Sequence, residues 1–166
     1  MKIIYYFFFY LSFLVFYSTF DFLLSPDFEK YYKYFEYYSG RISEPGAEQG
    51  HLYFFIPYLV TKIINIIDNS LTMNQLINIS LHLYNSFLIM VAIRGFTQYM
   101  HTKNYKSYNS YLISIPALFF GPLVYLRLSF KPEILFFSFI FWFLMILERY
   151  IKLEKKQDLV KAVILF

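Results

Sequence analysis

The sequence predicts an all-α fold: a polytopic membrane helix bundle of about four full spans, with interfacial helices in the first external loop and a truncated fifth span. Two observations, the composition and the placement of the charges, support this prediction. Hydrophobic residues make up 58% of the 166 residues and charged residues only 16%, whereas about a quarter of a soluble domain is charged. The charges fall between long apolar runs. The chain contains no cysteine, which excludes disulfides, thiolate metal sites and cysteine nucleophiles.

Four mostly uncharged runs are predicted to cross the membrane, because a span takes roughly 20 apolar residues. These predicted spans are residues 3–24, 73–93, 111–126 and 133–150. No small-residue cleavage site follows the first run, so we expect an uncleaved anchor rather than a signal peptide. A further apolar run begins at Leu159 and stops at Phe166. We therefore expect the chain to be the N-terminal part of a longer protein.

Residues 51–67 form another apolar run, and its placement decides the topology. It contains Pro57 and Lys62, and a charge at mid-membrane costs on the order of 3 kcal/mol. If this run lies in the interface or dips into the membrane, one side carries nine Lys and Arg against three acids, and the other side six against eight. The positive-inside tendency favours this version over a full span. The N-terminus is then cytoplasmic, the loop 25–72 is external, and the chain is an integral multi-pass protein of the cytoplasmic membrane if it is bacterial.

The external loop opens with an amphipathic stretch, SPDFEKYYKYFEYYSG, which covers residues 25–40. Ser25 followed by Pro26 predicts a helix start, and Gly40 predicts the helix end. Tyrosine suits a membrane surface because its ring is apolar and its hydroxyl stays in water. The aromatic residues that recur at helical spacing, and so predict a face on the bilayer surface, are Phe28, Tyr31, Tyr32, Phe35 and Tyr38.

In the order of its features the chain resembles the N-terminal part of the GT-C fold membrane glycosyltransferases, such as the protein O-mannosyltransferases and the lipid A aminoarabinose transferases. Asp27 and Tyr31 have the spacing of that family's aspartate–tyrosine motif, and Gly40 follows about a dozen residues on. The stretch EQGHLYFF, residues 48–55, is similar to the family's charged-proline segment. The chain departs from the family pattern at three places: Phe28 replaces a second acid, Gln49 a lysine, and Gly50-His51 the prolines.

The resemblance implies an inverting transferase that moves a sugar from a polyprenyl-phosphate donor to an external glycan, lipid or protein acceptor. It implies Asp27 as the catalytic base, with Asp21 as the rival carboxylate. The departing lipid phosphate needs cations nearby. The expected substrate-binding residues are Tyr31, Glu48, His51, Arg127, Lys131 and Glu133. No metal and no cofactor are expected, because the lipid-linked sugar is itself a substrate. A fragment of such an enzyme would lack much of the lipid and acceptor site.

Several of these residues also have a purely structural interpretation. Arg127 and Lys131 suit interface snorkelling, and Glu133 suits the N-terminus of a helix. Inside the second span, Asn78, His82 and Asn85 are expected to form hydrogen bonds with neighbouring helices.

The alternative function is a non-enzymatic multi-pass membrane protein, such as a transporter or flippase subunit. Polar groups near mid-membrane are expected of a transporter, whereas the acids here concentrate outside the spans, which favours the transferase. The net charge of +4 is distributed between apolar runs, so a nucleic-acid partner is not expected.

Overall fold

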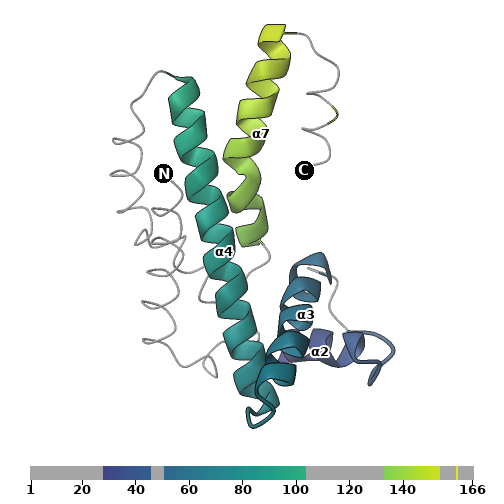
Figure 1. Cartoon of the computed structure of the whole chain (residues 1–166). Helices are drawn as coiled ribbons and strands as arrows, with labels where there is room; N and C mark the ends of the chain where they lie inside the picture. Colours follow the sequence, from purple (N-terminus) through teal and green to yellow (C-terminus); the bar gives the residue numbers. More distant parts are fainter. Residues whose placement is uncertain (1–27, 46–50, 104–132, 154–159, 161–166) are drawn as a thin grey trace.

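The computed structural model describes residues 28–45, 51–103, 133–153 and 160, and the part it describes is helical, with no strand. Its elements in chain order are α2 (Phe28–Tyr38), α3 (His51–Ile67), α4 (Met73–Thr102) and α7 (Glu133–Leu153). Figure 1 shows α4 as the long axis of this part, with α7 alongside its C-terminal portion. The helices α2 and α3 pack at its N-terminal end.

Two of these helices, α4 and the Glu133–Lys152 part of α7, are long and apolar enough to cross a membrane. They correspond to the predicted spans 73–93 and 133–150. The predicted spans 3–24 and 111–126 lie outside the described residues. The described part of the chain therefore supports two membrane-length helices, and not the four full spans that the sequence predicts.

Local signals fix the end of α2. Gly40 has a φ of +75°, a left-handed conformation that L side chains rarely adopt. The Gly40 N–H donates to the Tyr37 carbonyl and the Arg41 N–H to the Glu36 carbonyl, at 2.9 and 3.0 Å. These two bonds form a Schellman motif, which satisfies carbonyls at the helix end. The predicted stop at Gly40 is confirmed.

The helices α3 and α4 form an antiparallel hairpin joined by a short turn. Asp68 Oδ1 accepts hydrogen bonds from the Ser70 N–H and hydroxyl, and these bonds hold the pKa of Asp68 below its usual range. Thr72 then caps α4 in a reciprocal capping box with Gln75. Both ends of the turn are thus specified by side chains that hydrogen-bond to nearby backbone.

Two interhelical hydrogen bonds connect α3 to α4. The Tyr53 hydroxyl donates to Asn85 Oδ1 at 2.6 Å. Further along, Thr61 Oγ1 lies 2.9 Å from both Ser80 Oγ and the Pro57 carbonyl oxygen, so its single proton is shared between them. The expectation that Asn85 hydrogen-bonds to a neighbouring helix is confirmed.

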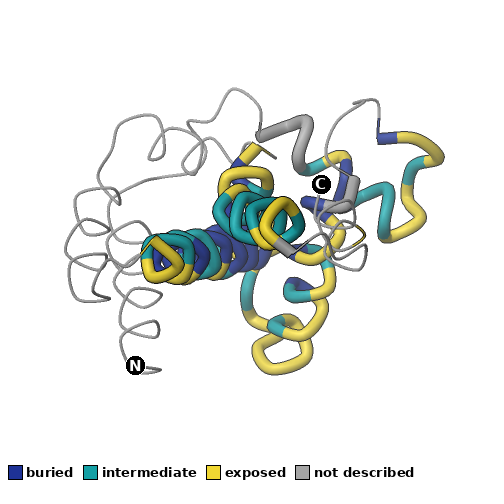
Figure 2. The backbone as a smooth tube through the Cα atoms, turned by 90° about the horizontal axis from the view of Figure 1, so that it is seen from above, coloured by how far each residue is buried: buried dark blue, intermediate teal, exposed yellow. Residues whose placement is uncertain are grey.

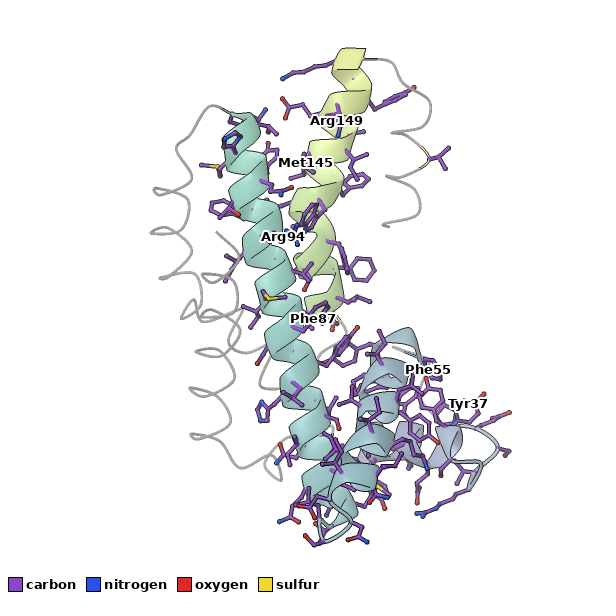
Figure 3. All side chains as sticks on the ribbon, in the orientation of Figure 1. Tyr37, Phe55, Phe87, Arg94, Met145 and Arg149 are labelled. Atoms are coloured by element: carbon purple, nitrogen blue, oxygen red, sulfur yellow. The ribbon has the colours of Figure 1, made fainter. Side chains whose placement is uncertain are left out.

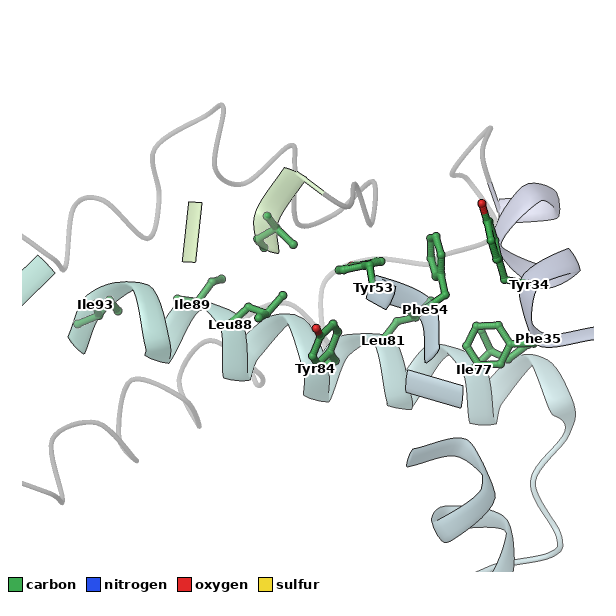
Figure 4. Packing of buried hydrophobic residues seen from close by; sticks show 11 residues of the cluster. Tyr34, Phe35, Tyr53, Phe54, Ile77, Leu81, Tyr84, Leu88, Ile89 and Ile93 are labelled. Atoms are coloured by element: carbon green, nitrogen blue, oxygen red, sulfur yellow. The ribbon is translucent and has the colours of Figure 1, made fainter. Parts of the chain in front are cut away.

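Aromatic side chains hold α2 against α3. Tyr34 stacks on Phe54 with ring centroids 4.7 Å apart, and Phe35 packs edge-on against Tyr58. The prediction that the aromatic face of α2 lies on the bilayer surface is wrong for Phe35, which is only 4% exposed. Ring stacking and burial against α3 stabilise this residue more than a half-wet interface would. Figure 4 shows how these rings continue into the row of aliphatic side chains along α4.

The helices α4 and α7 run parallel (Figure 1), since the contact of Val91 with Trp142 comes before the contact of Lys103 with Glu148 along both helices. The Trp142 indole N–H donates to the Val91 carbonyl at 3.0 Å, Phe96 packs on Phe141, and Lys103 pairs with Glu148 at 2.8 Å. A parallel pair is what the predicted topology requires of two spans that both run inward. Figure 2 shows that burial concentrates along α4, whereas α7 is largely half-buried or exposed.

The helix α4 extends beyond the predicted span. The sequence prediction ends the span at Ile93 and begins a cytoplasmic loop at Arg94, but the helix continues to Thr102. A single charge does not end a helix, because the backbone hydrogen bonds are unaffected by it. Trp142 contacts Arg94 through its ring, with the guanidinium carbon 5.9 Å from the ring centroid. Arg94 therefore belongs to the helix pair rather than to a loop.

Candidate functional site

A small hollow lies where α2, α3 and the first turn of α4 meet. Its volume is about 60 Å³. Polar, charged and apolar side chains of α2, α3, α4 and the segment after α2 line the hollow: Tyr32, Phe35, Glu36, Ser39, Arg41, Tyr58, Thr61, Lys62, Asn65, Met73 and Leu76. Ligand sites for whole drug-sized molecules are roughly 300 Å³ or more. The hollow is therefore the size of a single small polar group or a few waters, and it does not enclose a sugar.

Local structure places the two cations of this hollow. The Schellman motif at Gly40 turns the chain back at the end of α2 and leaves Arg41 directly behind it. Lys62 is exposed on α3, one turn after Tyr58, and its ammonium lies 5.3 Å from the centre of the Tyr58 ring. The aromatic face restrains the stem and the charge of Lys62 through a cation–π contact.

The charge balance of the hollow is positive. Arg41 and Lys62 contribute two positive charges and Glu36 one negative charge. The remaining polar groups that can donate hydrogen bonds to an anion are the hydroxyls of Tyr32 and Tyr58 and the amide of Asn65. The hydroxyls of Ser39 and Thr61 also line the hollow, but they already donate to other groups of the protein. This set of donors is suited to a phosphate or carboxylate at the rim.

Tyr38 packs against Tyr58, one of the residues that line the hollow. Its ring lies 5.4 Å from the rings of both Phe55 and Tyr58. Burial, with smaller contributions from Tyr34 and Tyr37, raises the pKa of Tyr38 to about 12. Tyr38 is therefore a neutral hydroxyl at physiological pH and not a base.

Next to the hollow, α3 presents an apolar face to its surroundings. Phe55, Leu59, Ile63 and Ile66 follow one another at three- and four-residue spacing, and Ile66 is 84% exposed. An uninterrupted apolar face of this kind is typical of a surface that contacts lipid or another protein. The prediction that residues 51–67 lie in the interface or dip into the membrane stays a prediction.

Most of the site residues predicted from the sequence, or their side chains, lie outside the part of the chain that the structure describes. Asp27, Glu48, Arg127 and Lys131 lie outside the described residues, as does the rival Asp21. Tyr31 lies in α2 and His51 is the first residue of α3, but the side chains of both are outside the described set. Glu133 begins α7, is exposed and does not line the hollow.

The sequence did not indicate that Arg41 and Lys62 line the same hollow. In the sequence, Lys62 argues against a full membrane span, and no pattern marks Arg41. Their shared hollow depends on the packing of α2 on α3, which the sequence does not specify. The described residues contain no cluster of three His, Asp or Glu side chains that could hold a metal ion.

Comparison with known protein families, curated proteins and solved structures finds no match to this chain.

Proposed function

We propose that the chain is a membrane glycosyltransferase, or the N-terminal fragment of one, that uses a polyprenyl-phosphate sugar as donor. The observation that carries the proposal is the cationic hollow behind α2, the helix that begins directly after Asp27. Its donors suit the phosphate of a lipid-linked sugar, and its size suits that group alone. The exposed apolar face of α3 lies beside it and suits the polyprenyl chain.

The transfer reaction needs a base for the acceptor and positive charge beside the departing phosphate. The acceptor oxygen attacks C1 of the sugar, the bond from C1 to the phosphate oxygen breaks with inversion, and the departing phosphate keeps the electron pair. Asp27 takes the acceptor proton as general base. Arg41 and Lys62 stabilise the negative charge of the phosphate, because charge-assisted hydrogen bonds to phosphate are the strong ones.

The first test is sugar transfer by membranes that contain the protein at its natural full length, with radiolabelled polyprenyl-phosphate mannose, glucose and aminoarabinose as donors. Asp27→Asn is expected to lower the rate by about 100-fold or more, the usual contribution of a general base. Glu44→Gln is the matched control, because Glu44 is an exposed carboxylate of the same loop. It is expected to leave the rate unchanged.

A second variant separates phosphate binding from chemistry. Lys62→Gln is expected to raise the donor KM by about tenfold, since one charge-assisted hydrogen bond is lost. Protein-dependent transfer that is insensitive to Asp27→Asn would contradict the assignment of the base. Absence of transfer from all three donors would contradict the proposed activity and favour the non-enzymatic alternative.

A further inference from the structure

The hollow behind α2 contains charges of both signs, and the binding of a phosphate accounts only for the positive ones. Arg41 and Lys62 are its cations, and Glu36 is the one acid among the described residues that line it. Figure 3 shows this end of the molecule, with Tyr37 of α2 and Phe55 of α3 labelled. The carboxylate of Glu36 therefore needs an explanation of its own.

Local structure holds Glu36 and Arg41 together at the backbone. The Arg41 N–H donates to the Glu36 carbonyl at 3.0 Å, as part of the Schellman motif at Gly40. The Ser39 hydroxyl donates to the same carbonyl at 2.8 Å. These bonds use no side-chain atom of Glu36, so they fix where its carboxylate begins without engaging the carboxylate itself.

The charged groups of the hollow do not neutralise one another. In the described part of the chain, no ion pair joins Glu36 to Arg41 or Lys62. Lys62 contacts the Tyr58 ring instead, with its ammonium 5.3 Å from the ring centroid. An acid and two cations that line one hollow without pairing can each act on a bound ligand, and such charges set specificity.

The donor and the product of the proposed transfer differ in two features that a carboxylate can distinguish. The lipid-linked sugar is a phosphodiester with a single negative charge, and sugar hydroxyls lie next to its phosphate. When the bond from C1 to oxygen breaks, the lipid keeps a phosphomonoester, which carries a charge of about −1.5 to −2 at pH 7. The hydroxyls leave with the sugar. A carboxylate accepts hydrogen bonds from hydroxyls and disfavours a further negative charge nearby.

We propose that Glu36 makes the hollow select the phosphodiester over the phosphomonoester, so that the lipid product leaves once its sugar has been transferred. Cations alone would hold the dianionic product more tightly than the singly charged donor, because Coulomb attraction scales with the charge of the ligand. For the same reason, the repulsion from Glu36 is about twice as large for the dianion. In the donor, Glu36 also accepts a hydrogen bond from a sugar hydroxyl, and the product has no such hydroxyl. The inference rests on the proposed function, since it takes the phosphate of the lipid-linked sugar as the ligand of the hollow.

The test measures binding without an acceptor, so it is read separately from transfer. The protein at its natural full length is purified in detergent, and the binding of radiolabelled polyprenyl phosphate is measured in competition with three unlabelled ligands. These are polyprenyl-phosphate glucose, the methyl ester of polyprenyl phosphate and inorganic phosphate. The methyl ester is a phosphodiester without a sugar, and it isolates the effect of charge from that of the hydroxyls.

Glu36→Gln is expected to change the two classes of lipid unequally. Polyprenyl phosphate should bind about tenfold more tightly, because the repulsion of its second charge is removed. Both phosphodiesters should change in affinity by about threefold or less, since they carry one charge and glutamine can still accept a hydrogen bond. A merely structural role of Glu36 would move all three lipids together.

Matched variants assign the effect to the carboxylate of the hollow. Glu36→Asp keeps the charge and is expected to keep the preference of the unaltered protein. Glu44→Gln removes the same charge from an exposed position that does not line the hollow, and it should leave the preference unchanged. Lys62→Gln is expected to weaken polyprenyl phosphate more than its methyl ester, which tests the charge balance at a second position even if Glu36→Gln fails to fold.

An unchanged ratio of the two affinities in Glu36→Gln would overturn the inference, while transfer of labelled sugar by the unaltered protein would still uphold the proposed function. Equal shifts in Glu36→Gln and Glu44→Gln would also overturn it, since they would indicate the general charge of the surface. Displacement by inorganic phosphate as effective as that by the lipids would show that the hollow binds a free anion. Absence of binding of every lipid to the unaltered protein would overturn both the inference and the assignment of the hollow to the donor phosphate.

Discussion

At the residue scale, single polar side chains determine how the helical hairpin of α3 and α4 is aligned. Tyr53 and Thr61 bind Asn85 and Ser80 across the interface, where apolar contacts alone would permit sliding. In a membrane such bonds contribute modestly, because the separated helices find other polar partners. Their value lies in selecting one alignment of the two helices.

The bond between Tyr53 and Asn85 gives a prediction for stability. In a double-mutant cycle of Tyr53→Phe and Asn85→Ala, we expect a coupling free energy of about 0.6 kcal/mol, and at most about 1.7 kcal/mol. The measurement is unfolding by SDS in mixed micelles. The control cycle pairs Tyr53→Phe with Asn65→Ala, an exposed position about three turns away on the same helix. It should be additive within roughly 0.5 kcal/mol, and coupling of the same size in both cycles would contradict the assignment.

At the element scale, the sequence predicts the existence of helices better than their limits. The uncharged runs locate α4 and α7, and Gly40 locates the end of α2, because each feature acts locally. The continuation of α4 through Arg94 was not predicted, since contacts with α7 stabilise that segment. The hollow with Arg41 and Lys62 was not predicted for the same reason: it exists only when α2 has packed on α3.

Close packing of α4 on α7 depends on the absence of a side chain at Gly95. Gly95→Ala places a Cβ 2.6 Å from the Trp142 indole, and the indole is restrained by its bond to Val91. We expect a loss of about 1–3 kcal/mol, the range for overpacking a core. The measurement is SDS-induced unfolding, together with the emission spectrum of Trp142.

A smaller ring should relieve that clash. Gly95→Ala combined with Trp142→Phe is expected to be less destabilised than the sum of the two single variants, because the phenyl ring leaves room for the Cβ. Gln98→Ala, at an exposed position of the same helix, controls for helix propensity and should change stability by no more than about 0.5 kcal/mol. Additive losses would show that the glycine matters for a reason other than Trp142.

At the scale of the whole molecule, the described helices divide its chemistry between two ends. Tyrosines, the hollow and the turn at Asp68 lie at the N-terminal end of α4, whereas the ion pairs of Glu148 and the two exposed arginines of α4 and α7 lie toward the other end. A parallel helix pair with such a distribution matches a protein whose cationic end faces the cytoplasm.

The absence of cysteine makes this arrangement directly testable in intact cells, because each introduced thiol is the only one. Ser43→Cys and Asn69→Cys, exposed positions at the α2–α3 end, are expected to react with a membrane-impermeant maleimide from outside. Thr102→Cys and Ile151→Cys, exposed at the C-terminal ends of α4 and α7, should react only after permeabilisation. Since the helices are parallel, these last two must share a side. Labelling of one but not the other from outside would refute the parallel pair, whereas reversal of all four would invert the predicted topology.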